Sequence, residues 1–159
     1  MRIVVLHAGG LGDLVLVESY LSALRDVHPA AQLELVCRAD VAPVTTLYAR
    51  PPDAVHTFGF NPYRWAIPDD GVALEARTLL HRLGDARADL FVSAELRATW
   101  LSEILAAVLA PREAVIADAR EARSSDMLIL LGKLRLDRRR GIRRLAPACA
   151  EHELDRYAR

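Results

Sequence analysis

The amino-acid sequence predicts an α/β fold, a Rossmann-like parallel sheet with helices on both faces. Short apolar runs alternate with amphipathic stretches along most of the chain, which is the pattern of a covered parallel sheet. The first apolar run, residues 3–6, stops at a glycine-rich turn, residues 7–13, and a new apolar series follows. The 159 residues are 52% hydrophobic and 26% charged, a composition typical of one globular domain with a sizeable core.

The first half of the chain is expected to contain three strands and three helices. After the glycine turn, apolar residues recur at helical spacing until a proline closes the helix. These residues are Leu14, Val17, Leu21 and Leu24, and the proline is Pro29. Residues 59–70, which include prolines and aromatic residues, have no periodicity and are expected to form a loop. The expected strands are 3–6, 32–37 and 54–58, and the expected helices are 13–27, 41–49 and 71–83.

The second half repeats the alternation of strands and helices. A strongly apolar helix is expected to stop before Pro111, and the highly charged residues 149–159 end the chain with no obvious closing strand. The expected strands are 88–93 and 114–117, the expected helices are 97–109 and 127–136, and residues 149–159 are compatible with a helix.

Composition and charge exclude several classes of protein. The 21 basic and 21 acidic residues balance, so the chain as a whole is not attracted to nucleic acid, and no nucleic-acid partner is expected. No run approaches the ~18 uninterrupted apolar residues of a membrane span, and we expect a cytoplasmic protein. The two cysteines, Cys37 and Cys149, lie outside any CxxC or Cys/His cluster, so we expect two buried or incidental thiols and no metal site.

Asp13 is the first candidate for chemistry, because it follows Gly9, Gly10 and Gly12 and precedes the apolar series of the first helix. Its carboxylate is open to two interpretations. As an N-cap it would satisfy unpaired backbone N–H groups and contribute about 1 kcal/mol. As a general base it would take the proton of an attacking hydroxyl, which requires no metal. The glycines likewise permit either a ligand close to the backbone or only a sharp turn.

Three segments in order carry a resemblance to a known family. The first is residues 1–6 followed by 10–16, with the tetrad Gly10-Leu11-Gly12-Asp13. The second is residues 88–97 followed by 114–117, and the third is residues 151–157. Together these segments resemble glycosyltransferase family 9, the bacterial ADP-heptose:lipopolysaccharide heptosyltransferases.

The resemblance implies a GT-B architecture, of which this chain would hold the N-terminal half. Residues 1–147 would form the acceptor-side domain, and residues 148–159 would lead toward a C-terminal domain that binds the nucleotide-sugar donor. An inverting, metal-independent transfer of heptose from ADP-heptose to a lipopolysaccharide-core or other glycan acceptor is implied, with no further cofactor. The chain alone is then expected to be inactive. Residues 17–19 read Val-Glu-Ser where the family has a threonine and a proline, which bears on the acceptor.

Asp13 stands at the position that the general base occupies in this family, so the resemblance implies that role for Asp13. Acceptor-binding candidates are residues that the predicted fold brings to the turn, to the end of the fourth strand and to the proline-containing loop. They are Gly10, Gly12, His7, Glu95, Arg97 and Arg64.

The densest run of charge begins at Lys133 and ends at Arg144, with seven basic residues and one acid. Such a run could contact a phosphorylated acceptor or the anionic inner leaflet, which would place the protein at the periphery of the inner membrane. A solvated connector is the simpler interpretation. Nucleic acid fits less well, because no aromatic residues are interleaved with the basic ones.

Two other functions remain open. A nucleotide-cofactor-binding domain of an oxidoreductase would need a GxGxxG turn, but this chain has Val15 at the third small position. The ribose-binding acid of such a domain would be Asp40, which lies later than the fingerprint requires. A non-catalytic domain that binds a glycan, a lipid or a protein is the other alternative.

Overall fold

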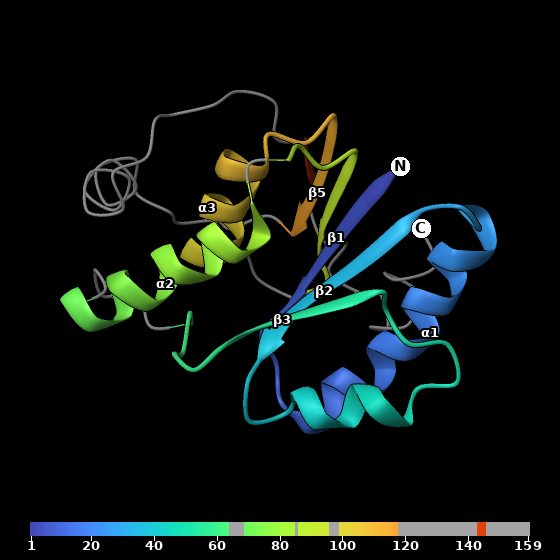
Figure 1. Ribbon diagram of the computed structural model, residues 1–159, viewed down its shortest axis with the longest axis horizontal. Coiled ribbons are helices and arrows are strands. Elements are labelled where there is room, and N and C mark those ends of the chain that lie inside the picture. The colour runs from blue at the N-terminus through green and yellow to red at the C-terminus, as the bar shows by residue number, and fades with distance from the viewer. Residues whose placement is uncertain (64–68, 85, 96–98, 118–142, 146–159) are drawn as a thin grey trace.

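The computed structural model describes residues 1–63, 69–84, 86–95, 99–117 and 143–145 (Figure 1). Within these residues six strands form one sheet, in the order β3-β2-β1-β4-β5-β6, and every neighbouring pair is parallel. The strands are β1 (Arg2–His7), β2 (Gln32–Arg38), β3 (Ala54–Phe58), β4 (Leu90–Ser93), β5 (Glu113–Ala117) and β6 (Arg143–Leu145). The predicted α/β Rossmann-like fold class is confirmed.

Helices cover both faces of the sheet, as Figure 1 shows. The helix α1 (Leu11–Val27) and the 3₁₀ helix η1 (Ala42–Leu47) lie on one face, and α2 (Asp70–Leu83) and α3 (Trp100–Leu109) lie on the other. Each face of the sheet has its own hydrophobic core, and alternate residues of β1 belong to one core or the other, because successive side chains of a strand point to opposite faces. Ile3 and Val5 pack with Leu14 of α1, whereas Val4 and Leu6 pack with α2 and α3.

The first helix begins at Leu11, two residues earlier than its apolar pattern predicts. Gly10 is the N-cap residue, with extended backbone angles, and Asp13 is the third residue of the helix. The interpretation of Asp13 as the N-cap is therefore wrong. Its side chain still stabilises the start of the helix, because Oδ2 accepts the N–H of Gly10 at 2.9 Å.

The other boundaries differ from the expectations for local reasons. The expected helix at 41–49 is the 3₁₀ helix η1. The helix α3 begins at Trp100, because Thr99 and Ser102 form a capping box there. The sheet also contains a strand that the sequence does not predict, since β6 pairs with β5. Three residues, two of them arginines, are too few to show strand periodicity. The expected helices at 127–136 and 149–159 lie outside the described residues.

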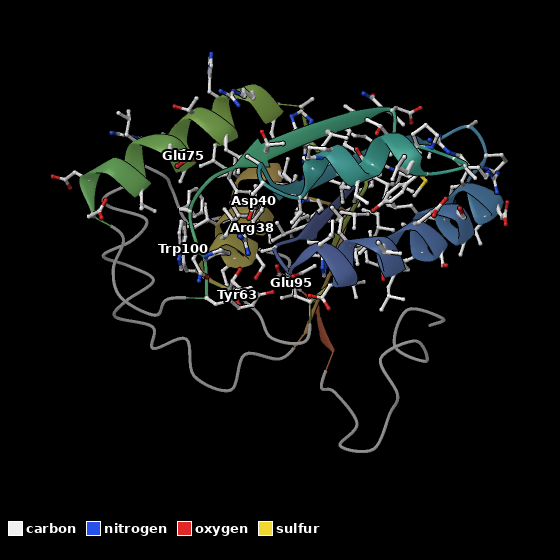
Figure 2. The ribbon with its side chains drawn as sticks, turned by 90° about the horizontal axis from the view of Figure 1, so that it is seen from below. Arg38, Asp40, Tyr63, Glu75, Glu95 and Trp100 are labelled. Atoms are coloured by element: carbon white, nitrogen blue, oxygen red, sulfur yellow. The ribbon has the colours of Figure 1, made fainter. Side chains whose placement is uncertain are left out.

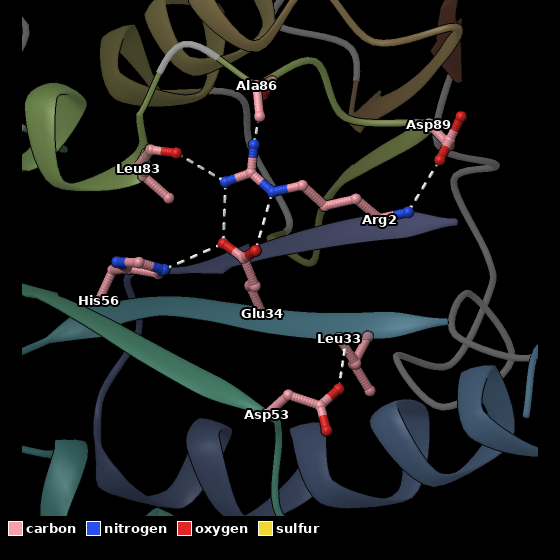
Figure 3. Close-up of polar contacts among 8 residues, drawn as sticks. All are labelled: Arg2, Leu33, Glu34, Asp53, His56, Leu83, Ala86 and Asp89. Carbon is pink, nitrogen blue, oxygen red and sulfur yellow. Dashed lines mark hydrogen bonds and ion pairs between the residues drawn. The ribbon is translucent and has the colours of Figure 1, made fainter. Parts of the chain in front are cut away.

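A buried ionic cluster joins β1, β2, β3 and the end of α2 (Figure 3). Arg2 Nε and Nη2 donate to the two oxygens of Glu34 at 2.8 and 2.9 Å, and Nη2 also donates to Leu83 O at 2.8 Å. His56 Nε2 lies 3.0 Å from Glu34 Oε2. Burial raises the pKa of Glu34, but the hydrogen bonds and charges of Arg2 and His56 outweigh it, so the pKa is lowered. Arg2 is the first residue of β1, so the cluster lies away from the edge where that strand ends.

No helix within the described part of the chain is long and apolar enough to cross a membrane.

Candidate functional site

The strand order reverses between β1 and β4, and the candidate site lies where these two strands end. In open parallel sheets, ligands bind outside the carboxyl ends of the strands at such a switch point. Leu6 of β1 is paired with Ser93 of β4, so the segments that follow His7 and Ser93 leave the sheet side by side. This places the glycine turn next to Glu95, as the predicted fold required.

The glycine turn is packed tightly at Gly9. A Cβ atom on Gly9 would lie 2.5 Å from His7 Nε2 and 2.7 Å from Asp13 Oδ2. A Cβ on Gly10 would lie 3.8 Å from its nearest neighbour, Asp13 Oδ2, and a Cβ on Gly12 would meet no atom within 4 Å. Among the described glycines only Gly84 has a positive φ. Close approach, and not a left-handed backbone, is therefore what the turn requires of Gly9.

Asp13 is exposed at the first turn of α1. Its Oδ2 accepts the Gly10 N–H, and no hydrogen bond from the described residues reaches Oδ1. The N–H groups of a first helical turn have no acceptor within the helix, and they carry a partial positive charge. The carboxylate is thus held in place by one oxygen while the other remains accessible.

His7 is buried, with 4% of its surface exposed, and its orientation is fixed. Its Nδ1 lies 2.6 Å from the carbonyl oxygen of Ala94. Because a carbonyl can only accept, Nδ1 carries a proton. The other nitrogen, Nε2, lies on the side of Gly9, near the carboxylate of Asp13. In the neutral ring Nε2 is an acceptor, and in the charged ring it is a donor beside that carboxylate.

Glu95 is the most perturbed acid of the site. Only 7% of its surface is exposed, and Oε1 accepts the backbone N–H of Ala8 at 2.7 Å. Burial raises its pKa to about 7, although the Ala8 N–H and the hydroxyl groups of Tyr63, Thr99 and Ser93 favour the charged form. Figure 2 shows Tyr63 beside Glu95, in the segment that follows β3.

The structure brings four of the predicted site residues to one edge, namely His7, Gly10, Asp13 and Glu95. Gly12 lies on the open side of the same turn. Arg64, Arg97 and residues 133–142 of the charge run lie outside the described residues.

Two other acids, Glu18 and Asp40, have structural partners. Glu18 Oε1 accepts the N–H of Ala49 at 2.6 Å and so holds the end of η1 against α1. Asp40 forms an ion pair with Arg38 at the end of β2. Figure 2 shows this pair at the same edge of the sheet as Glu95.

The sequence did not single out the groups that surround Glu95. The Ala8 N–H is a backbone group, so no residue pattern points to it. Two signals were present: Ser93 is a polar residue that ends an apolar strand, and Thr99 stands three positions before Ser102 at a helix start.

No group of three or more His, Cys, Asp or Glu side chains in the described part of the chain is arranged to hold a metal ion. Cys37 is buried, and burial raises the pKa of its thiol to about 12, so it remains a protonated thiol near neutral pH.

No protein-family model matches the sequence, and neither does any curated protein. Solved structures do match. Escherichia coli heptosyltransferase WaaC with ADP aligns over 99% of this chain and 45% of its own, with a TM-score of 0.58 and 18% identity. WaaC with ADP-2-deoxy-2-fluoro heptose aligns over 99% and 46%, with a TM-score of 0.59 and 17% identity.

A family 9 glycosyl transferase from Veillonella parvula DSM 2008 aligns over 86% of this chain and 42% of its own, with a TM-score of 0.57 and 16% identity. The chain spans less than half the length of each of these proteins. It shares their fold, as the resemblance of the sequence to glycosyltransferase family 9 implied.

Proposed function

We propose that this chain is the N-terminal, acceptor-side domain of an inverting, metal-independent glycosyltransferase related to family 9. The reaction would move heptose from ADP-heptose to a lipopolysaccharide-core or other glycan acceptor. The single observation that carries the proposal is the exposed Asp13 carboxylate on the fold that heptosyltransferase WaaC shares. The donor would bind mainly to a C-terminal domain, so the chain alone would not transfer sugar.

Asp13 would act as the general base. The acceptor hydroxyl gives its proton to Asp13 as its oxygen attacks the anomeric carbon, and the bond between that carbon and the nucleotide diphosphate breaks with its electrons on the leaving group. The hydrogen bond from Gly10 to Oδ2 fixes the carboxylate, so Oδ1 is the oxygen that would take the proton. Fixing a base within reach of its proton contributes to the rate, because the geometry is set before the reaction.

The acceptor would lie along the turn, close to His7, Gly10 and Gly12, with Arg97 and Arg64 as further binding candidates. Only 7% of the surface of Glu95 is exposed, so we assign it no direct contact with the acceptor. The basic run from Lys133 to Arg144 would contact the anionic inner leaflet, where such an acceptor is displayed, and the protein would be cytoplasmic and peripheral to that membrane.

The test compares Asp13→Asn with wild type in a mixture of this chain, a separately produced family 9 donor-binding domain, ADP-heptose and lipopolysaccharide core. The amide oxygen of asparagine can still accept the Gly10 N–H, so only the base is removed. We expect the rate of transfer to fall about 10²- to 10⁴-fold, with thermal stability nearly unchanged. Product is measured by mass spectrometry.

Glu18→Gln is the matched control, since it makes the same chemical change on the same helix and keeps the bond to Ala49. It should transfer sugar at the wild-type rate. Equal rates for Asp13→Asn and wild type would exclude Asp13 as the base. No transfer by any mixture of folded proteins would count against the proposed function itself.

The oxidoreductase alternative is favoured by one observation, the strand order 3-2-1-4-5-6 of dinucleotide-binding domains. Two others oppose it. Val15 stands where a small residue is wanted, and Asp40 is engaged by Arg38 instead of being available to a ribose. Titration with NAD separates the two functions, because only the alternative predicts tight binding by this chain.

A further inference from the structure

Glu95 connects two segments that are distant in the sequence. It lies two residues beyond the end of β4, and its Oε1 accepts the N–H of Ala8, which directly follows β1. Two more hydrogen bonds join the same segments: His7 Nδ1 to Ala94 O at 2.6 Å, and Ala94 N to Leu6 O at 2.9 Å. Three hydrogen bonds therefore hold the start of the glycine turn against the segment that follows β4.

The position of this turn sets the position of Asp13. Ala8 is buried, with 1% of its surface exposed, and only Gly9 and Gly10 separate it from α1. The Gly10 N–H holds Asp13 Oδ2, and Gly9 leaves no room for a Cβ beside that oxygen. A shift of Ala8 would thus be passed through two residues to the carboxylate.

The Glu95 carboxyl reaches the turn through an acceptor oxygen and not through an ion pair. No basic side chain among the described residues forms an ion pair with it. Its pKa of about 7 means that the group is partly protonated near neutral pH, when Oε1 can still accept the Ala8 N–H. Its burial also leaves little surface for direct contact with an acceptor.

We propose that Glu95 is a positioning residue: it fixes the Ala8–Gly10 turn by its hydrogen bond to the Ala8 N–H, and so holds Asp13 in place for proton transfer. The catalytic part of this inference rests on the proposed function, whereas the structural part is measurable in the chain alone.

The decisive variants are Glu95→Asp and Glu95→Gln. Aspartate keeps the charge but shortens the side chain by one methylene, so the oxygen no longer reaches Ala8. Glutamine loses the charge but keeps an oxygen at the same reach. If Glu95 positions the turn, Glu95→Asp should loosen the turn and Glu95→Gln should leave it as in wild type. If the charge of Glu95 is what matters, the two variants should behave the other way round.

The first readout is amide hydrogen exchange of the chain, followed residue by residue by NMR. In Glu95→Asp we expect exchange at Ala8 and Gly10 to accelerate at least about 10-fold, while the buried amide of Val5 in β1 is unchanged. In Glu95→Gln all three should stay within about threefold of wild type. Gly10 is the informative amide, because its N–H is bound to the carboxylate of Asp13.

Glu75→Asp is the matched control. Glu75 lies on α2, and its Oε1 accepts the N–H of Gly59, the residue just after β3. It therefore makes the same kind of bond as Glu95, from a glutamate to a backbone N–H just beyond a strand, at a different place in the fold. The variant should accelerate exchange at Gly59 and leave Ala8 and Gly10 at their wild-type rates.

The second readout is transfer in the mixture with a donor-binding domain. Glu95→Asp should lower kcat about 10- to 100-fold with the acceptor KM within threefold, because misplacing a base by about 1 Å costs up to 10²-fold in rate. Glu95→Gln should keep kcat within about threefold.

Three results would overturn the inference: unchanged exchange at Gly10 in Glu95→Asp, acceleration at Val5 as large as at Gly10, or a kcat that survives in Glu95→Asp and is lost in Glu95→Gln. If the wild-type mixture transfers no sugar, the proposed function fails. The exchange rates still decide whether Glu95 holds the turn.

Discussion

At the scale of single residues, Gly9 is the described glycine with the least room for a side chain. A Cβ there would lie 2.5 Å from His7 Nε2 and 2.7 Å from Asp13 Oδ2, so both side chains would have to move. We expect Gly9→Ala to lower the free energy of unfolding by about 1–3 kcal/mol, the usual cost of overpacking. Urea unfolding followed by circular dichroism measures this change.

Gly12→Ala is the control for that substitution. Gly12 is an exposed helical residue, and a Cβ there meets nothing within 4 Å. Alanine should therefore stabilise the chain, by up to about 1 kcal/mol, through its higher helix propensity. Equal effects of the two substitutions would show that the turn has more room at Gly9 than the structure indicates.

The sequence predicts the residues of the site that are close along the chain, but not the bond that joins its two halves. Asp13 and His7 belong to one strand–turn–helix unit, whose glycines and apolar periodicity are visible in order. The Ala8–Glu95 bond joins residues 87 positions apart and uses a backbone N–H. Only the three-dimensional pairing of β1 with β4 brings them together.

At the scale of elements, Arg2 and Glu34 hold three strands and the end of α2 together (Figure 3). Only 3% of the surface of Glu34 is exposed, so removing its main partner leaves a poorly compensated buried charge. We expect Arg2→Met to lower the free energy of unfolding by about 3–5 kcal/mol. Adding Glu34→Leu to that variant should recover most of the loss, and a double-mutant cycle measures the recovery.

The pH dependence of stability gives an independent check of this cluster. The pKa of Glu34 lies below its ordinary value of 4.5, so its contribution is complete above about pH 4.5 and is lost as the pH falls through the lowered pKa. The double variant should lack this loss. Arg50→Met removes the exposed ion pair with Asp26 and should change stability little at any pH. If Arg2→Met is equally mild, the cluster is not a main stabilising link.

The elements themselves were largely predictable, and the errors have physical causes. The first five strands match the predicted ranges to within two residues at each end. The apolar series predicts a later start for α1 than the structure shows, because its first buried residue is Leu14 and Leu11 and Gly12 are exposed. The strand β6 was missed because pairing with β5, and not an apolar pattern, defines it.

At the scale of the whole molecule, the two layers of helices position one edge of the sheet for function. Alternate residues of β1 are buried against α1 on one face and against α2 and α3 on the other. The strand is thus fixed on both sides, and so is the turn that leaves it. The fold was predictable from composition and alternation, but the nature of the ligand is not a property of the fold.

Nucleotide binding distinguishes the acceptor-side glycosyltransferase domain from an oxidoreductase domain. We expect this chain alone to bind no nucleotide tightly. A pyrophosphate at the start of α1 would find free N–H groups, but it would also meet the exposed carboxylate of Asp13. Calorimetric titration with ADP, ADP-heptose and NAD should therefore give dissociation constants no tighter than about 1 mM, a binding free energy of about −4 kcal/mol. Adding a family 9 donor-binding domain should produce binding of ADP-heptose, and sugar transfer once lipopolysaccharide core is also present as the acceptor. Micromolar binding of NAD by the chain alone would favour the oxidoreductase domain, and equally tight binding of ADP-heptose would mean that the chain has its own nucleotide site.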